Sequence, residues 1–348
     1  MDLAALLDDL DRESASLDEL VASRLDDWAR PTPAEGWTVA HQIAHLAWTD
    51  DAAALAATDQ AGFAALVDRA LVDPEGFVDS EAETIARTAL DGPSGSAALL
   101  TAWRQGRARL LEALRAVPPG TRLPWFGPPM SAASMATARL METWAHGQDV
   151  ADAYGVERAP TERLRHVAHL AVRARGFAYS VHGEAAPDAE VFVALASPHG
   201  SEWTWGDPAA AQRIEGPALD FCLLATRRRH RDDLHLVAVG PELVDGDDVR
   251  MVEPGHGLGL AAQARRRIVA ERLGAHPEEL ERHLTPEAWV VRAVDLAHAA
   301  RTERRDHAIR ADLRTRNQGH SGLSGWPPFY APGDGGAVAN GRGTPARR

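Results

Sequence analysis

Four long segments near the start of the chain carry apolar side chains at the spacing of an amphipathic helix. They cover residues 3–28, 38–58, 94–117 and 131–154, with shorter helical patterns at 60–71 and 80–90. Pro31 and Pro33 end the first segment, and Pro118 and Pro119 end the third. Long helices of this kind must bury their apolar faces against one another. The pattern therefore predicts a four-helix bundle whose facing side chains can build a site in the core.

The pattern becomes mixed after a further helix that begins near Thr161. Short runs rich in β-branched and aromatic residues, separated by turn residues, indicate strands. The expected elements are strands at 190–196, 202–205 and 234–239 and a helix at 218–229. The predicted fold class is therefore α+β, a helical bundle followed by a small α+β domain.

The chain is expected to divide into four parts. These are the bundle over 1–157, the small α+β domain over 161–240, a helical extension over 241–316 and a tail over 317–348. The tail is dense in Gly, Pro and Arg, which predicts disorder. The last two parts differ in composition from what precedes them. A divergent extension, a fused segment and a shifted reading frame are all open.

Composition narrows the function classes. The formal net charge of -13 argues against nucleic acid as the main partner. No run approaches the roughly 20 apolar residues of a membrane span, and the acidic N-terminus lacks the features of a signal peptide. The single cysteine, Cys222, excludes an intramolecular disulfide, and its apolar neighbours predict a buried core residue. We therefore expect a cytoplasmic protein that does not bind membranes.

Glu142 and His146 are the first candidates for chemistry. They lie four residues apart, so a helix places both on one face, among small apolar residues. A carboxylate and an imidazole are costly to bury there unless something satisfies them. A shared metal ion would do so, and so would a simple Glu–His hydrogen bond.

A second pair, His41 and His45, has the same spacing. The run imitates the H-E-x-x-H helix of zinc proteases, but Gln42 replaces the general-base carboxylate, which excludes that class. Spacing alone does not choose between the two histidines. One of them with Glu142 and His146 would give three protein ligands and an open position, as in catalytic zinc sites. Three carboxylates are candidates either to hold the imidazoles in one tautomer or only to solvate helix ends: Asp50, Asp51 and Asp149.

Two segments resemble a known family. GWTVAHQIAHLAWTD at 36–50 and the stretch 124–155 are similar to the N-terminal metal-binding domain of the mycothiol-dependent maleylpyruvate isomerases, within the DinB-like superfamily. Residues 216–240 resemble a related actinobacterial group sometimes labelled wyosine base formation. In DinB-like proteins the first ligand lies eight residues after the tryptophan of the GWT motif. The resemblance therefore implies the metal ligands His45, Glu142 and His146.

The resemblance also implies a reaction class. It predicts a divalent metal, with zinc expected, and mycothiol or a similar low-molecular-weight thiol as co-substrate. The protein would be an isomerase or thiol transferase acting on a small electrophilic substrate. The alternative is a metal-binding or small-thiol-binding protein without turnover. The run Arg227–Arg231 either binds a carboxylate or phosphate or complements a helix dipole. A tRNA-modifying role fits the acidic charge poorly.

Overall fold

The computed structural model describes residues 2–73, 76–92, 95–126, 129–181 and 186–239. The expected helical extension over 241–316 and the tail over 317–348 lie outside the described residues. Among the helices that are described, none has both the length and the apolar character needed to span a bilayer.

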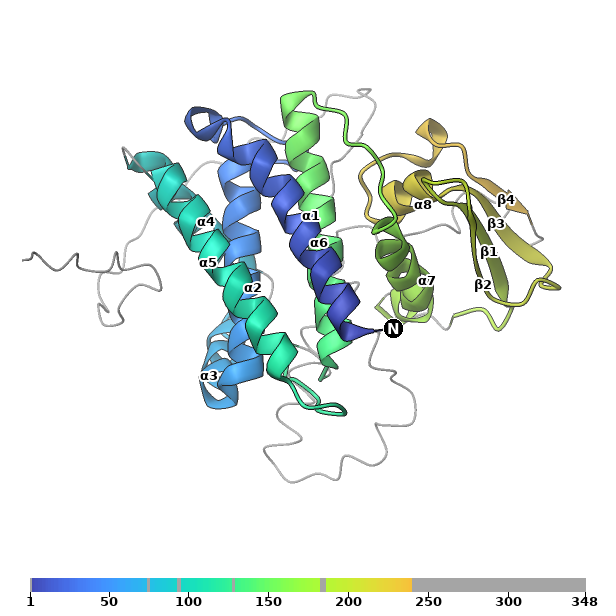
Figure 1. Ribbon diagram of the computed structural model, residues 1–348, viewed down its shortest axis with the longest axis horizontal. Helices are drawn as coiled ribbons and strands as arrows, with labels where there is room; N and C mark the ends of the chain where they lie inside the picture. Colours follow the sequence, from blue (N-terminus) through green and yellow to red (C-terminus); the bar gives the residue numbers. More distant parts are fainter. Residues whose placement is uncertain (1, 74–75, 93–94, 127–128, 182–185, 240–348) are drawn as a thin grey trace, which may run out of the picture. The chain divides into compact units, whose positions relative to one another are not determined.

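The first part of the chain is a helical bundle (Figure 1). Its four long helices are α1 (Leu3–Ala22), α2 (Val39–Thr58), α5 (Gly95–Ala116) and α6 (Ala132–Tyr154). Helix α2 packs against α5 and α6, and α1 packs against α6 and α5. The shorter helices α3 (Gln60–Ala70) and α4 (Phe77–Asp91) both contact α2, and α4 also contacts α5. The bundle predicted from helical spacing is confirmed.

The first helix is shorter than its apolar spacing predicts. It ends at Ala22, and a single 3-10 turn, η1 (Leu25–Asp27), follows. Trp28 nevertheless reaches the core, because the chain turns back and its indole N–H donates to the carbonyl of Val21 at 3.2 Å. An apolar residue beyond a helix end can thus keep helical spacing by coincidence.

Helices α2 and α6 form the centre of the bundle. Residues 135–151 of α6 are all buried, as are most residues of α2. A helix buried on every face lies within a core rather than on its surface. Every polar side chain on this part of α6 must therefore find a partner inside the protein.

The second part combines a sheet with two helices. Its elements are α7 (Leu164–Val181), β1 (Val191–Ala196), β2 (Glu202–Trp205), β3 (Gln212–Pro217), α8 (Ala218–Ala225), a 3-10 turn η2 (Arg231–Asp233) and β4 (Val237–Val239). The strand order is β2-β1-β3-β4, with β1 and β3 parallel and the outer pairs antiparallel. Helix α7 packs against both α6 and α8. The predicted α+β class is confirmed.

Two features of this part differ from expectation. Strand β3, with the sequence QRIEGP, has no apolar alternation and forms by pairing with β1 across the sheet. Helix α8 ends at Ala225 rather than Arg229. The chain leaves it through Arg227, whose φ of 60° is left-handed and incompatible with a continuing helix.

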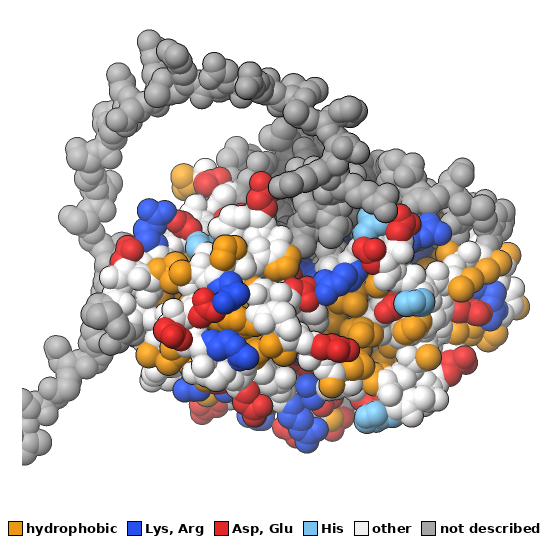
Figure 2. Space-filling model, turned by 90° about the horizontal axis from the view of Figure 1, so that it is seen from above, with side chains coloured by type: hydrophobic (Ala, Val, Ile, Leu, Met, Phe, Trp, Pro, Cys, Tyr) orange, Lys and Arg blue, Asp and Glu red, His pale blue; other side chains and the backbone are white. Residues whose placement is uncertain are grey.

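The surface carries mixed charge. On the face shown in Figure 2, the described basic side chains lie among acidic ones rather than in a patch of their own. Ion pairs at the surface include Arg69–Glu81 and Arg87–Glu83.

Candidate metal centre

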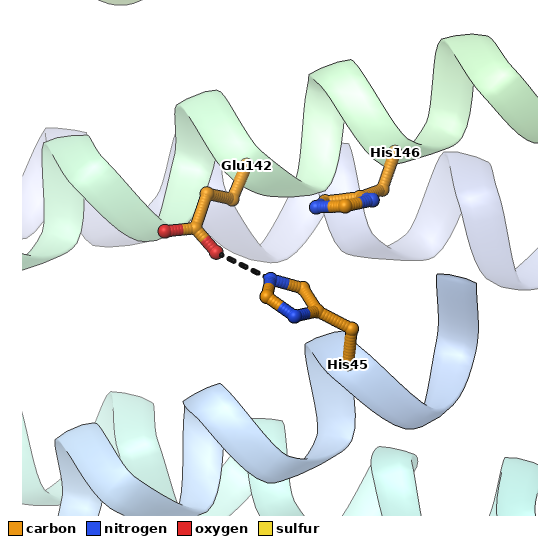
Figure 3. A group of neighbouring side chains, drawn as sticks. All are labelled: His45, Glu142 and His146. Atoms are coloured by element: carbon orange, nitrogen blue, oxygen red, sulfur yellow. Dashed lines mark hydrogen bonds and ion pairs between the residues drawn. The ribbon is translucent and has the colours of Figure 1, made fainter. Parts of the chain in front are cut away.

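The structure brings together the three side chains that the family resemblance selects. His45 projects from α2, and Glu142 and His146 project from α6 toward it (Figure 3). One nitrogen or oxygen from each residue lies within 4.8 Å of those of the other two. His45 Nε2 lies 3.1 Å from Glu142 Oε2, and the two imidazole centroids are 4.5 Å apart. Each of the three residues is at most 2% exposed.

His41 lies outside this group. Its Nδ1 accepts a hydrogen bond from the backbone N–H of Thr38 at 3.2 Å, at the start of α2. Its Nε2 lies 2.5 Å from Glu83 of α4. His41 therefore satisfies the helix terminus and contacts α4, while His45, one turn later, faces α6. Among the two histidines that spacing left open, the structure places only His45 beside Glu142 and His146.

The hydrogen bonds of Gln42 determine which ring nitrogen of His146 can coordinate a metal. The Gln42 amide N–H donates to Thr32 Oγ1 at 2.9 Å, and Thr32 Oγ1 donates in turn to the carbonyl of Trp37 at 3.0 Å. The Gln42 carbonyl oxygen is thereby left to accept from Nδ1–H of His146. With Nδ1 protonated, Nε2 is the nitrogen through which His146 can coordinate a metal. The sequence interpretation treated Gln42 only as a missing base and overlooked this role.

Trp37 covers the imidazoles. Its ring is stacked on His146, with centroids 6.0 Å apart and planes 17° apart, and lies 5.6 Å from the ring of His45. The indole comes from the loop before α2, which Thr32 and the short bridge between Pro31 and Thr38 hold closed. The tryptophan of the GWT motif therefore shields the site from water.

A buried arginine contacts the carboxylate of the group. Arg139 Nη1 donates to Glu142 Oε2 at 2.6 Å, and its Nε donates to Asp50 Oδ1 at 2.9 Å. The indole N–H of Trp103 donates to Asp50 Oδ2 at 3.2 Å. All of these side chains are buried. The expectation that Asp50 holds an imidazole is wrong, because both of its oxygens serve Arg139 and Trp103.

The same contacts set the charge of the carboxylates. Burial alone would raise the pKa of the Glu142 carboxyl, but the charge of Arg139 and the hydrogen bonds from His45 and Arg139 outweigh it, and the pKa is lowered. For Asp50, burial raises the pKa and Arg139 opposes that shift. Glu142 is thus held as a carboxylate, the form in which it can bind a metal.

The other predicted imidazole partners have different roles. Both oxygens of Asp149 accept hydrogen bonds from Arg228, at 3.2 and 2.7 Å, so the expectation that Asp149 holds an imidazole is also wrong. Asp51 pairs with Arg109 near the surface.

Two arginines of the predicted arginine run form ion pairs with α6. Within Arg227–Arg231, Arg228 is buried against Asp149, and Arg229 pairs with Asp152 at 2.6 Å. The run therefore connects the end of α8 to α6.

Cys222 is fully buried, its Sγ–H donates to the carbonyl of Leu164, and burial raises the pKa of its thiol. The prediction of a core cysteine is confirmed.

The donor set suits a divalent ion. Two imidazole nitrogens and one carboxylate oxygen are a known three-ligand set of catalytic zinc sites, with bonds of about 2.0–2.2 Å. Ligand atoms around one ion lie roughly 3–3.5 Å apart. The hydrogen-bonded His45 Nε2 and Glu142 Oε2 are 3.1 Å apart, and the three donors together lie within 4.8 Å of one another. The described residues bring three donors together here, one fewer than the four of a tetrahedral zinc site.

Comparison with known proteins gives a family model, two relatives and a solved structure. Residues 10–151 match the family model described as the mycothiol maleylpyruvate isomerase N-terminal domain. Two uncharacterized proteins of Mycobacterium tuberculosis, from strains CDC 1551 / Oshkosh and H37Rv, are each 55% identical over 235 residues, or 67% of this chain and 89% of theirs. A crystal structure of the mycothiol-dependent maleylpyruvate isomerase aligns with a TM-score of 0.47 at 16% identity, over 68% of this chain and 93% of that one.

The bundle and its triad place the chain in the DinB-like class of helical proteins. Within that class, the chain belongs to the family that carries the mycothiol maleylpyruvate isomerase N-terminal domain, together with the two mycobacterial proteins. The family resemblance seen in the sequence is therefore confirmed.

Proposed function

We propose that this protein is a cytoplasmic, metal-dependent enzyme that uses a low-molecular-weight thiol, mycothiol or a close relative. It would catalyse isomerisation of a small electrophilic substrate or transfer of the thiol to it. The observation that carries the proposal is the convergence of His45, Glu142 and His146 in one buried group. Membership of a family named for a mycothiol-dependent isomerase supports the choice of thiol.

In this proposal each residue of the site has a defined task. His45, Glu142 and His146 hold the divalent ion, for which zinc is the expected metal. The bound ion supplies Lewis acidity, which lowers the pKa of a thiol at the fourth position. Gln42 keeps the proton of His146 on Nδ1, and Trp37 excludes water from the imidazoles.

Metal analysis tests the first half of the proposal. Wild-type protein purified without chelator should contain close to one divalent ion per chain, and Glu142→Ala should contain almost none. His41→Ala is the matched control, because His41 lies on the same helix outside the triad. Equal metal content in wild type and Glu142→Ala would refute the assignment of ligands.

A thiol-dependence screen tests the second half. The zinc-loaded protein should consume small electrophiles such as cis-enoyl acids when mycothiol is present. Omitting the thiol, or removing the metal with a chelator, should abolish that consumption. Turnover that is equal with and without thiol would contradict a thiol-dependent reaction.

The second candidate is a protein that binds a metal or a small thiol without turnover. The burial of all three triad residues, none more than 2% exposed, favours this alternative. It predicts metal binding and, with thiol present, saturable thiol binding, but no consumption of any electrophile. The same screen therefore separates the two functions.

A further inference from the structure

The Glu142 oxygen that lies beside His45 also contacts a permanent cation, the guanidinium of Arg139. Glu142 Oε2 lies 3.1 Å from His45 Nε2 and accepts from Arg139 Nη1 at 2.6 Å. The Glu142 oxygen nearest His45 is therefore also the oxygen that Arg139 contacts. Arg139 belongs to α6 itself, three residues before Glu142, so it lies on the same face of the helix.

Arg139 is fixed in place from its other side. Its Nε–H donates to Asp50 Oδ1, and Asp50 is in turn held by the indole of Trp103. The two carboxylates keep the pKa of Arg139 above its usual value although burial lowers it. Nη2 of Arg139 has no hydrogen-bond partner among the described residues, so neither carboxylate contacts this end of the guanidinium.

The buried charges do not cancel. The two ion pairs of Arg139 join one guanidinium to two carboxylates, those of Glu142 and Asp50, which is a net charge of -1 when both carboxylates are ionised. A divalent ion would change this to +1. A buried site is stabilised when its charges balance, so a loaded site of charge +1 favours a fourth ligand that carries a single negative charge.

We propose that Arg139 is a positioning residue with two effects. Its positive charge beside Glu142 lowers the affinity of the site for the metal, and it leaves the loaded site with a net positive charge that favours an anionic fourth ligand. The inference rests on the metal site proposed above and deepens it. It assigns to Arg139 and Asp50 opposite effects, although the two residues form one ion pair. A purely structural ion pair would give effects of the same sign when either member is removed.

The first test measures zinc affinity by competition with a chromophoric chelator, at one pH near 8. Arg139→Met removes a positive charge beside Oε2 and should tighten zinc binding about tenfold or more. Asp50→Asn leaves Arg139 uncompensated and should weaken zinc binding about threefold or more. Arg139→Lys keeps the charge and should stay close to wild type.

The second test measures the fourth ligand. Cobalt-loaded protein is titrated with 2-mercaptoethanol, and the thiolate-to-cobalt charge-transfer band reports binding. Arg139→Met makes the loaded site neutral and should weaken thiolate binding about tenfold, while Asp50→Asn should strengthen it. The order of the variants is therefore reversed between the two titrations.

The outcomes separate this inference from the proposed function. If wild type fails to bind zinc tightly, or if Glu142→Gln binds zinc as tightly as wild type, the metal site itself is refuted. If wild type binds zinc but both variants weaken it, or neither changes it, Arg139 has only a structural role and the inference is wrong. If Arg139→Met does not fold, Asp50→Asn decides alone: unchanged or tighter zinc binding would overturn the inference.

Discussion

Helix α6 carries two groups of charged side chains, two turns apart, that are built in opposite ways; the Glu142 group is buried, and the Asp149 group is buried at Asp149–Arg228 and half-buried at Asp152–Arg229. Around Asp149 and Asp152, two carboxylates meet two guanidinium groups, Arg228 and Arg229, in charge-balanced pairs. Around Glu142, the carboxylates of Glu142 and Asp50 meet one guanidinium among the described residues, that of Arg139, and the imidazoles of His45 and His146 lie beside Glu142. The first group is complete within the protein. The second brings together one donor atom each from His45, Glu142 and His146, close enough to hold one ion.

The charge balance of a buried group distinguishes a structural role from a ligand-binding role. A buried ion pair with every hydrogen bond made can lock two elements together, here α6 and the end of α8. A buried group that remains unbalanced is costly unless a ligand completes it. We interpret the Asp149–Arg228 group as a structural link and the Glu142 group as a ligand site.

The largest expected effect is on metal binding. Replacing His45 by Ala removes one of three protein ligands and should weaken zinc binding by about a thousandfold or more. The same substitution at His41 should change the zinc affinity less than about threefold, because His41 contacts Thr38 and Glu83 instead. Chelator competition on both variants checks this. Equal losses for the two histidines would contradict the assignment.

A smaller effect is expected on stability when the balanced group is broken. Asp149→Asn leaves the charge of Arg228 buried without its partner and should lower the free energy of unfolding by about 3–5 kcal/mol. Zinc affinity should stay within about threefold of wild type. Urea unfolding monitored by circular dichroism measures the stability loss.

The double variant Arg228→Met, Asp149→Leu is the control for this prediction. It removes both charges and should recover most of the lost stability. A double variant as unstable as Asp149→Asn would show that the ion pair does more than balance charge.

A more moderate effect is expected at the hydrogen bond behind His146. Gln42→Leu removes the acceptor for Nδ1–H and should weaken zinc binding about 10- to 100-fold. Thr32→Val leaves Gln42 in place but removes its partner, so its effect should be smaller. Isothermal titration with zinc measures both. An effect of Thr32→Val larger than that of Gln42→Leu would argue against the proposed chain of hydrogen bonds.

The smallest effect is expected at the contact between His41 and Glu83, where the Glu83 side chain is 44% exposed. Glu83→Gln should change the free energy of unfolding by less than about 1 kcal/mol, since exposed ion pairs contribute little to stability. It should leave zinc binding unchanged. A strong loss of zinc binding in this variant would mean that the wrong histidine has been assigned to the site.

The sequence predicted the long helices and the candidate ligands, but it left one choice open. The i, i+4 spacing of His41 and His45 is the same, and only the family register favoured His45. The structure gives the reason: His41 lies in the first turn of α2, where free backbone N–H groups need partners, and His45 lies where α2 faces α6.

The supporting residues could not be read from spacing. Gln42 and Asp50 act across an interface between helices, so their partners depend on packing rather than on sequence distance. Arg139 did leave a signal: it lies three residues before Glu142 on a face of otherwise small and apolar side chains. Strand β3 was missed because its residues are polar and it forms only by pairing with β1.

The central claim is that one ion binds between α2 and α6. A crystal of zinc-soaked protein, with anomalous diffraction recorded on both sides of the zinc edge, tests it directly. One strong peak is expected about 2.0–2.2 Å from Nε2 of His45, Nε2 of His146 and a carboxylate oxygen of Glu142. A peak elsewhere, or no peak at this position in saturating zinc, would contradict it.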